Sequence, residues 1–548
     1  MIKTIRGLNR LQIFVLTKIK LNGMKPLQIF LLAFGIAGLA FSCKTQKAEK
    51  IESSVPAYQE AYRPQFHFSP AGNWMNDPNG MVYYDGEYHL FYQYYPDSTV
   101  WGPMHWGHAV STDLVHWQHL PIALYPDSLG YIFSGSAVMD LNNTSGLGEP
   151  GKPAMIAIYT YHNQKLSDQG RIDFQYQGLA YSVDKGRTWV KYRNNPVLPN
   201  PGLKDFRDPK VSWNPETGKW IMTLAVGDHI RFYSSADLKE WKLESEFGKN
   251  LGAHGGVWEC PDLFELPVEN DPGTKKWVLF VSINPGAPNG GSGTQYFVGS
   301  FDGHTFKWEE PSVKWIDHGM DNYAGVTWSN VDTRKIFLGW MSNWAYAQVV
   351  PTHPWRSAMT VPRELSLLFR NNEYLLKSNP VKELDQLATL LMNNEKVELG
   401  PAGTELKFDG EELTVSKVKM DVSLESADEL IIEISNAKDQ KVILGYKSAS
   451  GELYMDRTMA GKSDFEPTFA SKIHKLEIEK SLQKVTLELL IDKSSVEFFF
   501  NEGSYAMTDL LFPEADYNAL KIYVKSGKAR INSLQVYSLK SVWDNLSK

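Results

Sequence analysis

Three carboxylates stand in turn-forming motifs directly ahead of strand-like segments. They are Asp77 in Trp-Met-Asn-Asp-Pro-Asn-Gly at 74–80, Asp208 in Phe-Arg-Asp-Pro at 206–209 and Glu259 in Trp-Glu-Cys-Pro-Asp at 258–262. Proline, asparagine and glycine bend the backbone sharply, so each acid can be aimed out of a turn instead of being buried in a strand. Turn chemistry alone explains one such motif, whereas its recurrence indicates a shared chemical role.

Two carboxyl groups that face each other across a glycosidic bond can hydrolyse it. One attacks the anomeric carbon and the other protonates the leaving oxygen, and in the retaining geometry they stand about 5 to 5.5 Å apart. Glu259 is flanked in the sequence by an aromatic residue and a cysteine rather than by hydrogen-bond donors, so we expect it to be the proton donor and Asp77 the nucleophile. We expect Asp208, beside Arg207, to stay ionised and to stabilise an oxocarbenium-like transition state.

The elements that position these acids repeat. A pattern of Ser-x-Asp, a turn and then Trp recurs between residues 66 and 370, with copies that begin at Ser111, Ser182, Ser235 and Ser300. Short apolar strands at such spacing, with little helical periodicity, are typical of a β-propeller with four-stranded blades. A further strand-rich unit at 321–368 makes five blades. The three acids would then open blades one, three and four and meet at one mouth of the propeller axis.

Beyond residue 370 the pattern changes, and a chain of 548 residues is expected to form more than one domain. The spacing of Leu384, Leu387 and Leu391 predicts a short helical connector within 371–395. Alternating apolar segments then predict a β-sandwich at 396–548, for which we favour a structural role. These segments are 430–434, 442–446, 476–478, 485–491, 496–500, 520–524 and 531–537. The predicted fold class is all-β, a five-bladed β-propeller followed by a C-terminal β-sandwich.

The N-terminal region has the pattern of an export signal. Lys25 precedes an apolar stretch at 27–41 that is too short to span a bilayer comfortably and suits a signal peptide. Ala-Phe-Ser-Cys at 40–43 is similar to a bacterial lipobox, so we expect 1–43 to be a lipoprotein signal peptide, Cys43 to be lipidated and 44–65 to be a flexible tether. The expected location is the cell envelope, in the periplasm or on the outer-membrane surface. The alternative is plain secretion, with Cys43 lost in the discarded peptide.

Composition and the weaker motifs exclude other classes of function. A formal net charge of -7 argues against nucleic acid as a partner, and 13% aromatic residues suit either the filling of cores or stacking on sugars. His105 and His108 face opposite sides of a predicted strand, so we expect no shared metal and no cofactor. Cys260 has no evident histidine partner and is expected to be buried. The glycine-rich stretch 286–294 lacks the ending of a phosphate-binding loop and predicts a wide connection at the channel rim.

The three acidic motifs resemble the signature motifs of glycoside hydrolase family 32, which comprises invertases, inulinases and levanases, and the resemblance covers about 67–369. It implies a five-bladed propeller with a C-terminal β-sandwich and retention of anomeric configuration. It also implies that Asp77 is the nucleophile, Asp208 the transition-state stabiliser and Glu259 the general acid/base. The stretch 286–299 looks most like that of exo-acting members. Fructose contacts are implied for Asn76, Gln93, Trp101, Phe133, Ser134, Arg207 and Trp340.

The function predicted from these features is hydrolysis of β-D-fructofuranosides with release of fructose. We expect an exo-acting enzyme on levan or inulin-type fructans, with sucrose as a further substrate, and a membrane contact only through the lipid anchor. The alternatives are a fructosyltransferase, an endo-acting levanase and a non-enzymatic fructan-binding surface protein. The intact set Asp77, Asp208 and Glu259 argues against the last of these.

Overall fold

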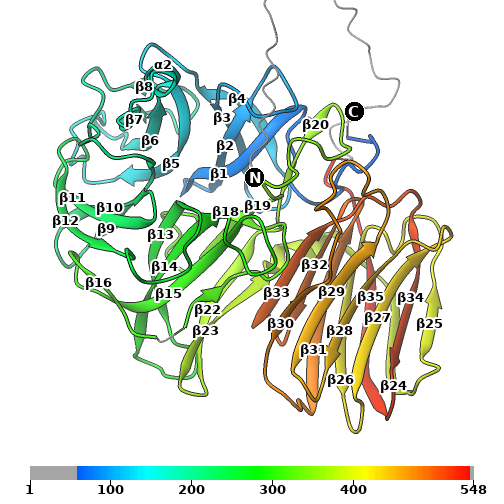
Figure 1. Ribbon diagram of the computed structural model, residues 1–548. Coiled ribbons are helices and arrows are strands. Elements are labelled where there is room, and N and C mark those ends of the chain that lie inside the picture. The colour runs from blue at the N-terminus through cyan, green and yellow to red at the C-terminus, as the bar shows by residue number, and fades with distance from the viewer. Residues whose placement is uncertain (1–57, 311, 544–548) are drawn as a thin grey trace, which may run out of the picture. The chain divides into compact units, whose positions relative to one another are not determined.

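The computed structural model describes residues 58–310 and 312–543, and nearly all of its regular structure is β-strand. Five sheets follow one another along the chain from residue 73 to residue 380, coloured blue to yellow-green in Figure 1. The first contains β1 (Asn73–Tyr84), β2 (Glu87–Tyr95), β3 (His105–Ser111) and β4 (Gln118–Leu124). The second contains β5 (Tyr131–Asp140), β6 (Ala154–His162), β7 (Gln175–Ser182) and β8 (Val190–Lys191). The third contains β9 (Phe206–Asn214), β10 (Lys219–Val226), β11 (His229–Ser235) and β12 (Lys242–Phe247).

The last two of these sheets complete the propeller. The fourth contains β13 (Val257–Pro267), β14 (Lys275–Asn284), β15 (Gly293–Phe301) and β16 (Phe306–Trp308). The fifth contains β18 (Tyr323–Thr327), β19 (Lys335–Met341), β22 (Arg363–Arg370) and β23 (Glu373–Pro380). Short strands extend three sheets: β17 (Lys314–Trp315) pairs with β15, β20 (Trp355–Arg356) with β1 and β21 (Ala358–Met359) with β19. The innermost strands β1, β5, β9, β13 and β18 contact one another in a closed ring. The predicted five-bladed propeller is confirmed.

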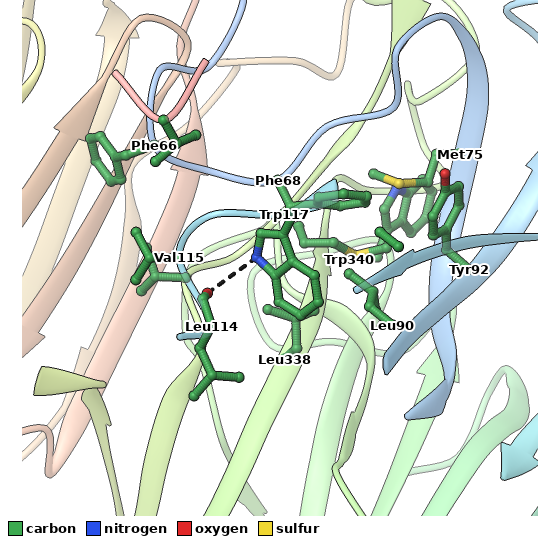
Figure 2. Close-up of a cluster of buried hydrophobic side chains, with 14 of the residues drawn as sticks. Phe66, Phe68, Met75, Leu90, Tyr92, Leu114, Val115, Trp117, Leu338 and Trp340 are labelled. Atoms are coloured by element: carbon green, nitrogen blue, oxygen red, sulfur yellow. Dashed lines mark hydrogen bonds between the residues drawn. The ribbon is translucent and has the colours of Figure 1, made fainter. Parts of the chain in front are cut away.

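The repeated Ser-x-Asp motif closes the outer hairpin of a blade. In the first blade Oδ1 of Asp113 accepts hydrogen bonds from the backbone amides of Val115, at 3.0 Å, and His116, at 2.8 Å. The indole of Trp117 donates to the carbonyl of Leu114 at 3.1 Å, and this bond is drawn in Figure 2. The third blade repeats the arrangement at 235–241. The aspartate therefore satisfies the turn amides while the tryptophan packs over the turn, which explains why these residue types recur.

The remainder of the described chain forms two six-stranded sheets, coloured yellow to red in Figure 1, with one apolar core between them. One contains β24 (Ala388–Leu399), β35 (Ala529–Leu539), β26 (Ser416–Ser423), β31 (Lys484–Asp492), β32 (Ser495–Phe500) and β33 (Tyr505–Leu510). The other contains β25 (Thr404–Lys407), β34 (Tyr517–Val524), β27 (Glu429–Asn436), β28 (Lys441–Lys447), β29 (Glu452–Met459) and β30 (His474–Glu477). The predicted sandwich is confirmed: six of the seven predicted segments lie within one of these strands, and the seventh, 476–478, runs one residue past the end of β30.

The predicted connector at 371–395 is wrong in its extent. Strand β23 still belongs to the fifth blade, a short 3-10 helix covers only Lys382–Leu387, and β24 begins at Ala388. Leu384 and Leu387 are buried as their spacing suggested. From Ala388 onward the backbone pairs with β35, and this long-range pairing outweighs a local helical pattern.

The predicted tether at 44–65 is wrong for its last residues, which are packed. The ring of Tyr58 stacks on Trp543 with centroids 4.2 Å apart, and the backbone amide of Gln65 donates to Asp492 at 2.8 Å. The signal peptide, Cys43 and the rest of the tether lie outside the described residues. Within the described ranges, no helix is long and apolar enough to cross a membrane.

A buried ionic cluster joins the propeller to the sandwich. Both ring nitrogens of His67 contact carboxylates, Nδ1 that of Asp492 and Nε2 that of Glu497, each at 2.8 Å. Arg363, from the fifth blade, contacts Glu497 and lies 3.0 Å from Asp317. These charged side chains are almost entirely buried, so each depends on its partners for compensation.

Candidate active site

A cavity of about 330 Å³ opens where the innermost strands meet. Every predicted site residue of the propeller except Trp340 lines it. The complete lining is Asn76, Asp77, Gln93, Trp101, Phe133, Ser134, His162, Phe174, Gln175, Asp205, Arg207, Asp208, Glu259, Trp344 and Gln348. Three acids that are far apart in the sequence therefore meet in one cavity.

Irregular backbone at the inner strands aims these side chains. The strand pairing of all five inner strands shifts register within 75–78, 132–135, 207–210, 259–262 and 323–326. Asp208 and Cys260 also adopt positive φ angles, of 62° and 44°. Such bulges turn a side chain away from the regular alternation of a strand, and a proline within them loses no ladder hydrogen bond. The Asp-Pro and Cys-Pro pairs in the sequence motifs mark three of these bulges.

The Asp77 carboxylate is held at both oxygens. Nδ2 of Asn76 donates to Oδ1 at 2.9 Å, and the hydroxyl of Ser134 donates to Oδ2 at 2.8 Å. Asn76 is itself fixed by the indole of Trp74, which donates to its amide oxygen at 2.7 Å. Burial, followed by the nearby negative charge of Glu259, raises the pKa of Asp77, and the hydrogen bonds from Asn76 and Ser134 oppose that shift. The carboxylate is thus oriented toward the cavity by two blades.

Asp208 does not have the electrostatic environment that its neighbour in sequence suggested. Nε of Arg207 lies 3.9 Å from Oδ2 of Asp208, and the backbone amide of Cys260 donates to the same oxygen at 3.1 Å. Burial raises the pKa of Asp208, the Arg207 charge opposes this, and the negative charges of Glu259 and Asp77 add to the rise, which brings it to about 7. The expectation that Arg207 keeps Asp208 ionised is therefore wrong, because burial outweighs one guanidinium in setting this pKa.

Glu259 is surrounded by donors, contrary to the expectation from its sequence neighbours. Nη2 of Arg207 donates to Oε1 at 2.9 Å and Nε donates to it at 3.2 Å. The hydroxyl of Tyr323, from the fifth blade, donates to Oε2. Arg207 also contacts Asp205 at 2.6 Å and Gln175 at 3.4 Å. Glu259 is thereby oriented by residues from the third and fifth blades.

The thiol of Cys260 lies close to two of the acids. Its sulfur lies 3.5 Å from Oδ2 of Asp77 and 3.6 Å from Oδ2 of Asp208. Burial and then the charges of Asp208, Asp77 and Glu259 raise the pKa of this thiol well above its usual value. A thiol that stays protonated is a poor nucleophile, so Cys260 serves as packing between the carboxylates, and its predicted burial is confirmed.

Trp340 was predicted to contact the substrate, but it does not line the cavity. It is fully buried in the cluster drawn in Figure 2, with its ring centroid 6.1 Å from that of Trp74 and 5.0 Å from that of Trp344. Trp344, four residues further on, lines the cavity instead. Trp340 faces the interior because it lies within β19, whereas Trp344 follows the end of that strand.

Several residues of the site were missed by sequence reasoning. One of them, His162, belongs to an aromatic part of the cavity wall: its ring stacks on that of Phe133 at 4.3 Å, and Trp101 contacts Phe133 edge-on at 6.0 Å. Asp205 could have been found beside the Phe-Arg-Asp-Pro motif. The other missed residues carry no local signal of their own and are Tyr323, His162, Phe174, Gln175, Trp344 and Gln348.

A five-bladed propeller that presents paired carboxyl groups in one aromatic-walled cavity defines the chain as a glycosidase. Two family models match: the Glycosyl hydrolases family 32 N-terminal domain over residues 67–380 and the Glycosyl hydrolases family 32 C terminal over 383–538. The chain belongs to glycoside hydrolase family 32.

Characterised relatives are similar over most of their length. The chain is 47% identical to a levanase of Bacillus subtilis over 524 residues, which covers 94% of this chain and 75% of the relative. It is 39% identical to an extracellular exo-inulinase of Aspergillus niger, with 89% and 96% covered. The crystal structure of an exo-inulinase from Aspergillus awamori superposes with a TM-score of 0.81 at 36% identity, with 89% of this chain and 100% of that chain covered.

Proposed function

We propose that this protein is an exo-acting β-fructosidase that releases fructose from levan or inulin-type fructans and from sucrose. The observation that carries the proposal is the meeting of Asp77, Asp208 and Glu259 in one cavity with aromatic walls. The names of similar proteins, levanase and exo-inulinase, support the substrate class. A cavity of about 330 Å³ lies at the small end of the range for ligand pockets, which suits a single terminal sugar unit.

The roles follow from the contacts of each acid. A carboxylate oxygen of Asp77 forms a bond to the anomeric carbon as the bond to the leaving oxygen breaks, and Glu259 gives that oxygen its proton. Water then attacks the same carbon, Glu259 accepts the proton of that water, and the bond to Asp77 breaks. Because two inversions occur, fructose is released with its original anomeric configuration.

Asp208 is proposed to bind hydroxyl groups of the fructosyl unit. Burial beside two other acids raises its pKa to about 7. A hydroxyl group that donates a hydrogen bond to Asp208 favours the ionised form. The resulting carboxylate stabilises positive charge that develops on the sugar ring in the transition state.

Product analysis tests this function. The purified protein is incubated with levan, inulin and sucrose, and the products are separated by chromatography. We expect free fructose as the first product of both polymers, and fructose equal to glucose from sucrose. Oligosaccharides as first products would indicate endo-action, and an excess of glucose over fructose would indicate transfer to a sugar hydroxyl. No products from any of the three substrates would contradict the proposal.

We also propose that the protein is exported and held in the cell envelope by a lipid on Cys43. The supports are the apolar stretch at 27–41 and the small residues before Cys43. We expect the wild-type protein in the membrane fraction and the Cys43→Ala variant outside it. A soluble wild-type protein that lacks residues 1–43 would instead indicate plain secretion.

A further inference from the structure

The glycine-rich loop 285–292 between β14 and β15 is compact. The amides of Gly286 and Ala287 donate to the carbonyl of Gly291 at 3.0 and 3.2 Å. A Cβ atom at Gly291 would lie 2.1 Å from Oδ1 of Asn343, and the φ angle there is 66°. Only glycine fits this conformation and this close approach. The loop that the sequence predicted as a wide connection is therefore a fixed structure.

One side of this loop is attached to the sandwich through Asn289, whose side chain is buried. Its Nδ2 donates to the carbonyl of Lys475 at 3.1 Å, and its Oδ1 accepts from the amide of Lys475 at 3.2 Å. Lys475 lies in β30, an edge strand of the sandwich. The Asn289 amide thus pairs with the exposed edge of that sheet as another strand would.

The same side chain also holds the interface segment 316–321. Nδ2 of Asn289 donates to the carbonyl of His318 at 2.7 Å. In turn the amide of His318 donates to Ala506 at 2.8 Å, and that of Asp321 donates to Thr508 at 3.0 Å. Both acceptors lie in β33 of the sandwich. Asn289 is therefore attached to the sandwich twice, directly and through this segment.

The other side of the loop is hydrogen-bonded to a residue that lines the catalytic cavity. The hydroxyl oxygen of Ser292 accepts from the backbone amide of Trp344 at 3.3 Å. Asn343 accepts from the amides of Ser292, at 3.4 Å, and Ala345, at 3.0 Å, and donates to the carbonyl of Met320 at 2.7 Å. Trp344 lines the cavity. Hydrogen bonds on both sides of the loop, joined by the loop's own backbone, therefore connect a sandwich edge strand to the cavity wall.

We infer that Asn289 is a positioning residue through which the sandwich domain fixes Trp344 in the wall of the sugar-binding cavity. The kinetic part of this inference rests on the proposed function. Trp344 follows the end of β19 and has no strand ladder of its own, so its backbone amide is held by Ser292 and the next amide, of Ala345, by Asn343. Fixing a ring in its bound position lowers the entropic cost of sugar binding.

The test compares Asn289→Ala with Arg370→Ala. Arg370 forms another contact between propeller and sandwich, at 3.0 Å from Glu479, and is not attached to the loop. Hydrogen exchange of the segment 341–349 is expected to be faster in Asn289→Ala than in the wild type and unchanged in Arg370→Ala. For levan or inulin, we expect KM to rise about fivefold or more in Asn289→Ala while kcat changes less than about twofold, because a uniform loss of binding affects KM.

A double-variant cycle decides whether the effect passes through Trp344. In a Trp344→Ala background, adding Asn289→Ala is expected to leave KM unchanged. Unchanged exchange at 341–349 in Asn289→Ala would overturn the inference, as would a KM increase that persists without the Trp344 ring. A wild-type protein inactive on fructosides would refute the proposed function, and the exchange comparison would still decide the inference.

Discussion

Nη2 of Arg207 lies 2.9 Å from Oε1 of Glu259, and Nε of the same guanidinium lies 3.2 Å from the same oxygen. The guanidinium thus holds one carboxylate oxygen of Glu259 with two donors, while the hydroxyl of Tyr323 holds the other. A carboxyl group fixed at both oxygens keeps one rotamer, which suits a proton donor that must face a bound glycosidic oxygen. The fourth blade supplies the acid, and its neighbours in the ring orient it.

Replacing Tyr323 by phenylalanine tests this orientation. The variant loses the hydroxyl that donates to Oε2 of Glu259 and keeps the ring, which is buried in the core. We expect kcat to fall about ten- to a hundredfold, because hydrogen bonds to charged groups contribute ~1.5–3 kcal/mol. Steady-state kinetics on sucrose measure this, with the melting temperature as control. An unchanged kcat in a folded variant would show that Tyr323 does not orient the acid.

Trp344 and Trp340 are expected to respond differently to truncation. Trp344→Ala removes part of the cavity wall, so KM should rise while the protein stays folded. Trp340→Ala leaves a hole in a fully buried cluster and should destabilise the protein by about 3–5 kcal/mol. Denaturant unfolding and kinetics on both variants separate the two roles. A stable Trp340→Ala variant with a raised KM would contradict the assignment of Trp340 to the core.

The buried carboxyl of Asp208 makes stability depend on pH. Its pKa is about 7 in the folded protein, against 3.8 for an ordinary aspartate. Between these values the folded state holds a proton that the unfolded state has lost, so stability falls as pH rises through this window. Asp208→Asn has no carboxyl group to ionise at this position, so this loss of stability with rising pH is absent in the variant. We expect the variant to melt at a higher temperature than the wild type at pH 8, with a smaller difference at pH 4.

Asp113 provides the matched control for that prediction. Burial raises its pKa, but hydrogen bonds from the His116 ring and from backbone amides outweigh burial and lower the pKa. The sign is therefore reversed: Asp113→Asn should lower the melting temperature at pH 7, and the difference should shrink as pH falls toward the pKa of the carboxyl. If both variants shift the melting temperature in the same direction at every pH, the account of Asp208 is wrong.

The ionic cluster at the domain interface should limit stability in alkali. Burial alone would lower the pKa of His67, but its hydrogen bonds to Asp492 and Glu497 outweigh burial and raise it to about 9. The stabilisation is complete below pH 6.5 and is lost as pH rises through about 9. We expect the wild-type melting temperature to fall between pH 7 and pH 10.

In His67→Gln this alkaline fall should be weaker, and the variant should be less stable at pH 6 by about 3–5 kcal/mol, because buried Asp492 loses its counter-charge and Glu497 keeps only that of Arg363. Thermal unfolding across the pH series measures both effects. Equal pH dependence in the two proteins would assign the alkaline fall to another group.

The catalytic acids could be predicted from the sequence because their signals are local. A proline next to Asp77 or Asp208 marks a bulge, and a bulge at an inner strand aims its side chain at the axis. The hairpin motif that ends in Trp117 likewise carries its reason within a few residues. Five blades and a sandwich followed from such repeated patterns.

The errors concern properties that depend on the folded surroundings. Burial decides the pKa of Asp208, and distant residues supply the donors to Glu259, so neither could be read from sequence neighbours. Trp340 and Trp344 differ only in their position relative to the end of β19. Tyr58 lies in the stretch predicted to be a flexible tether, but its ring packs against Trp543, which is distant in the sequence.

The most direct test of the central claim is the turnover of Asp77→Asn on fructan and on sucrose, measured with its melting temperature. If Asp77 is the nucleophile of a site built with Asp208 and Glu259, kcat should fall by more than about a thousandfold. The fold should persist, because asparagine retains the shape of the side chain. A folded Asp77→Asn variant that releases fructose at a near-normal rate would contradict the account.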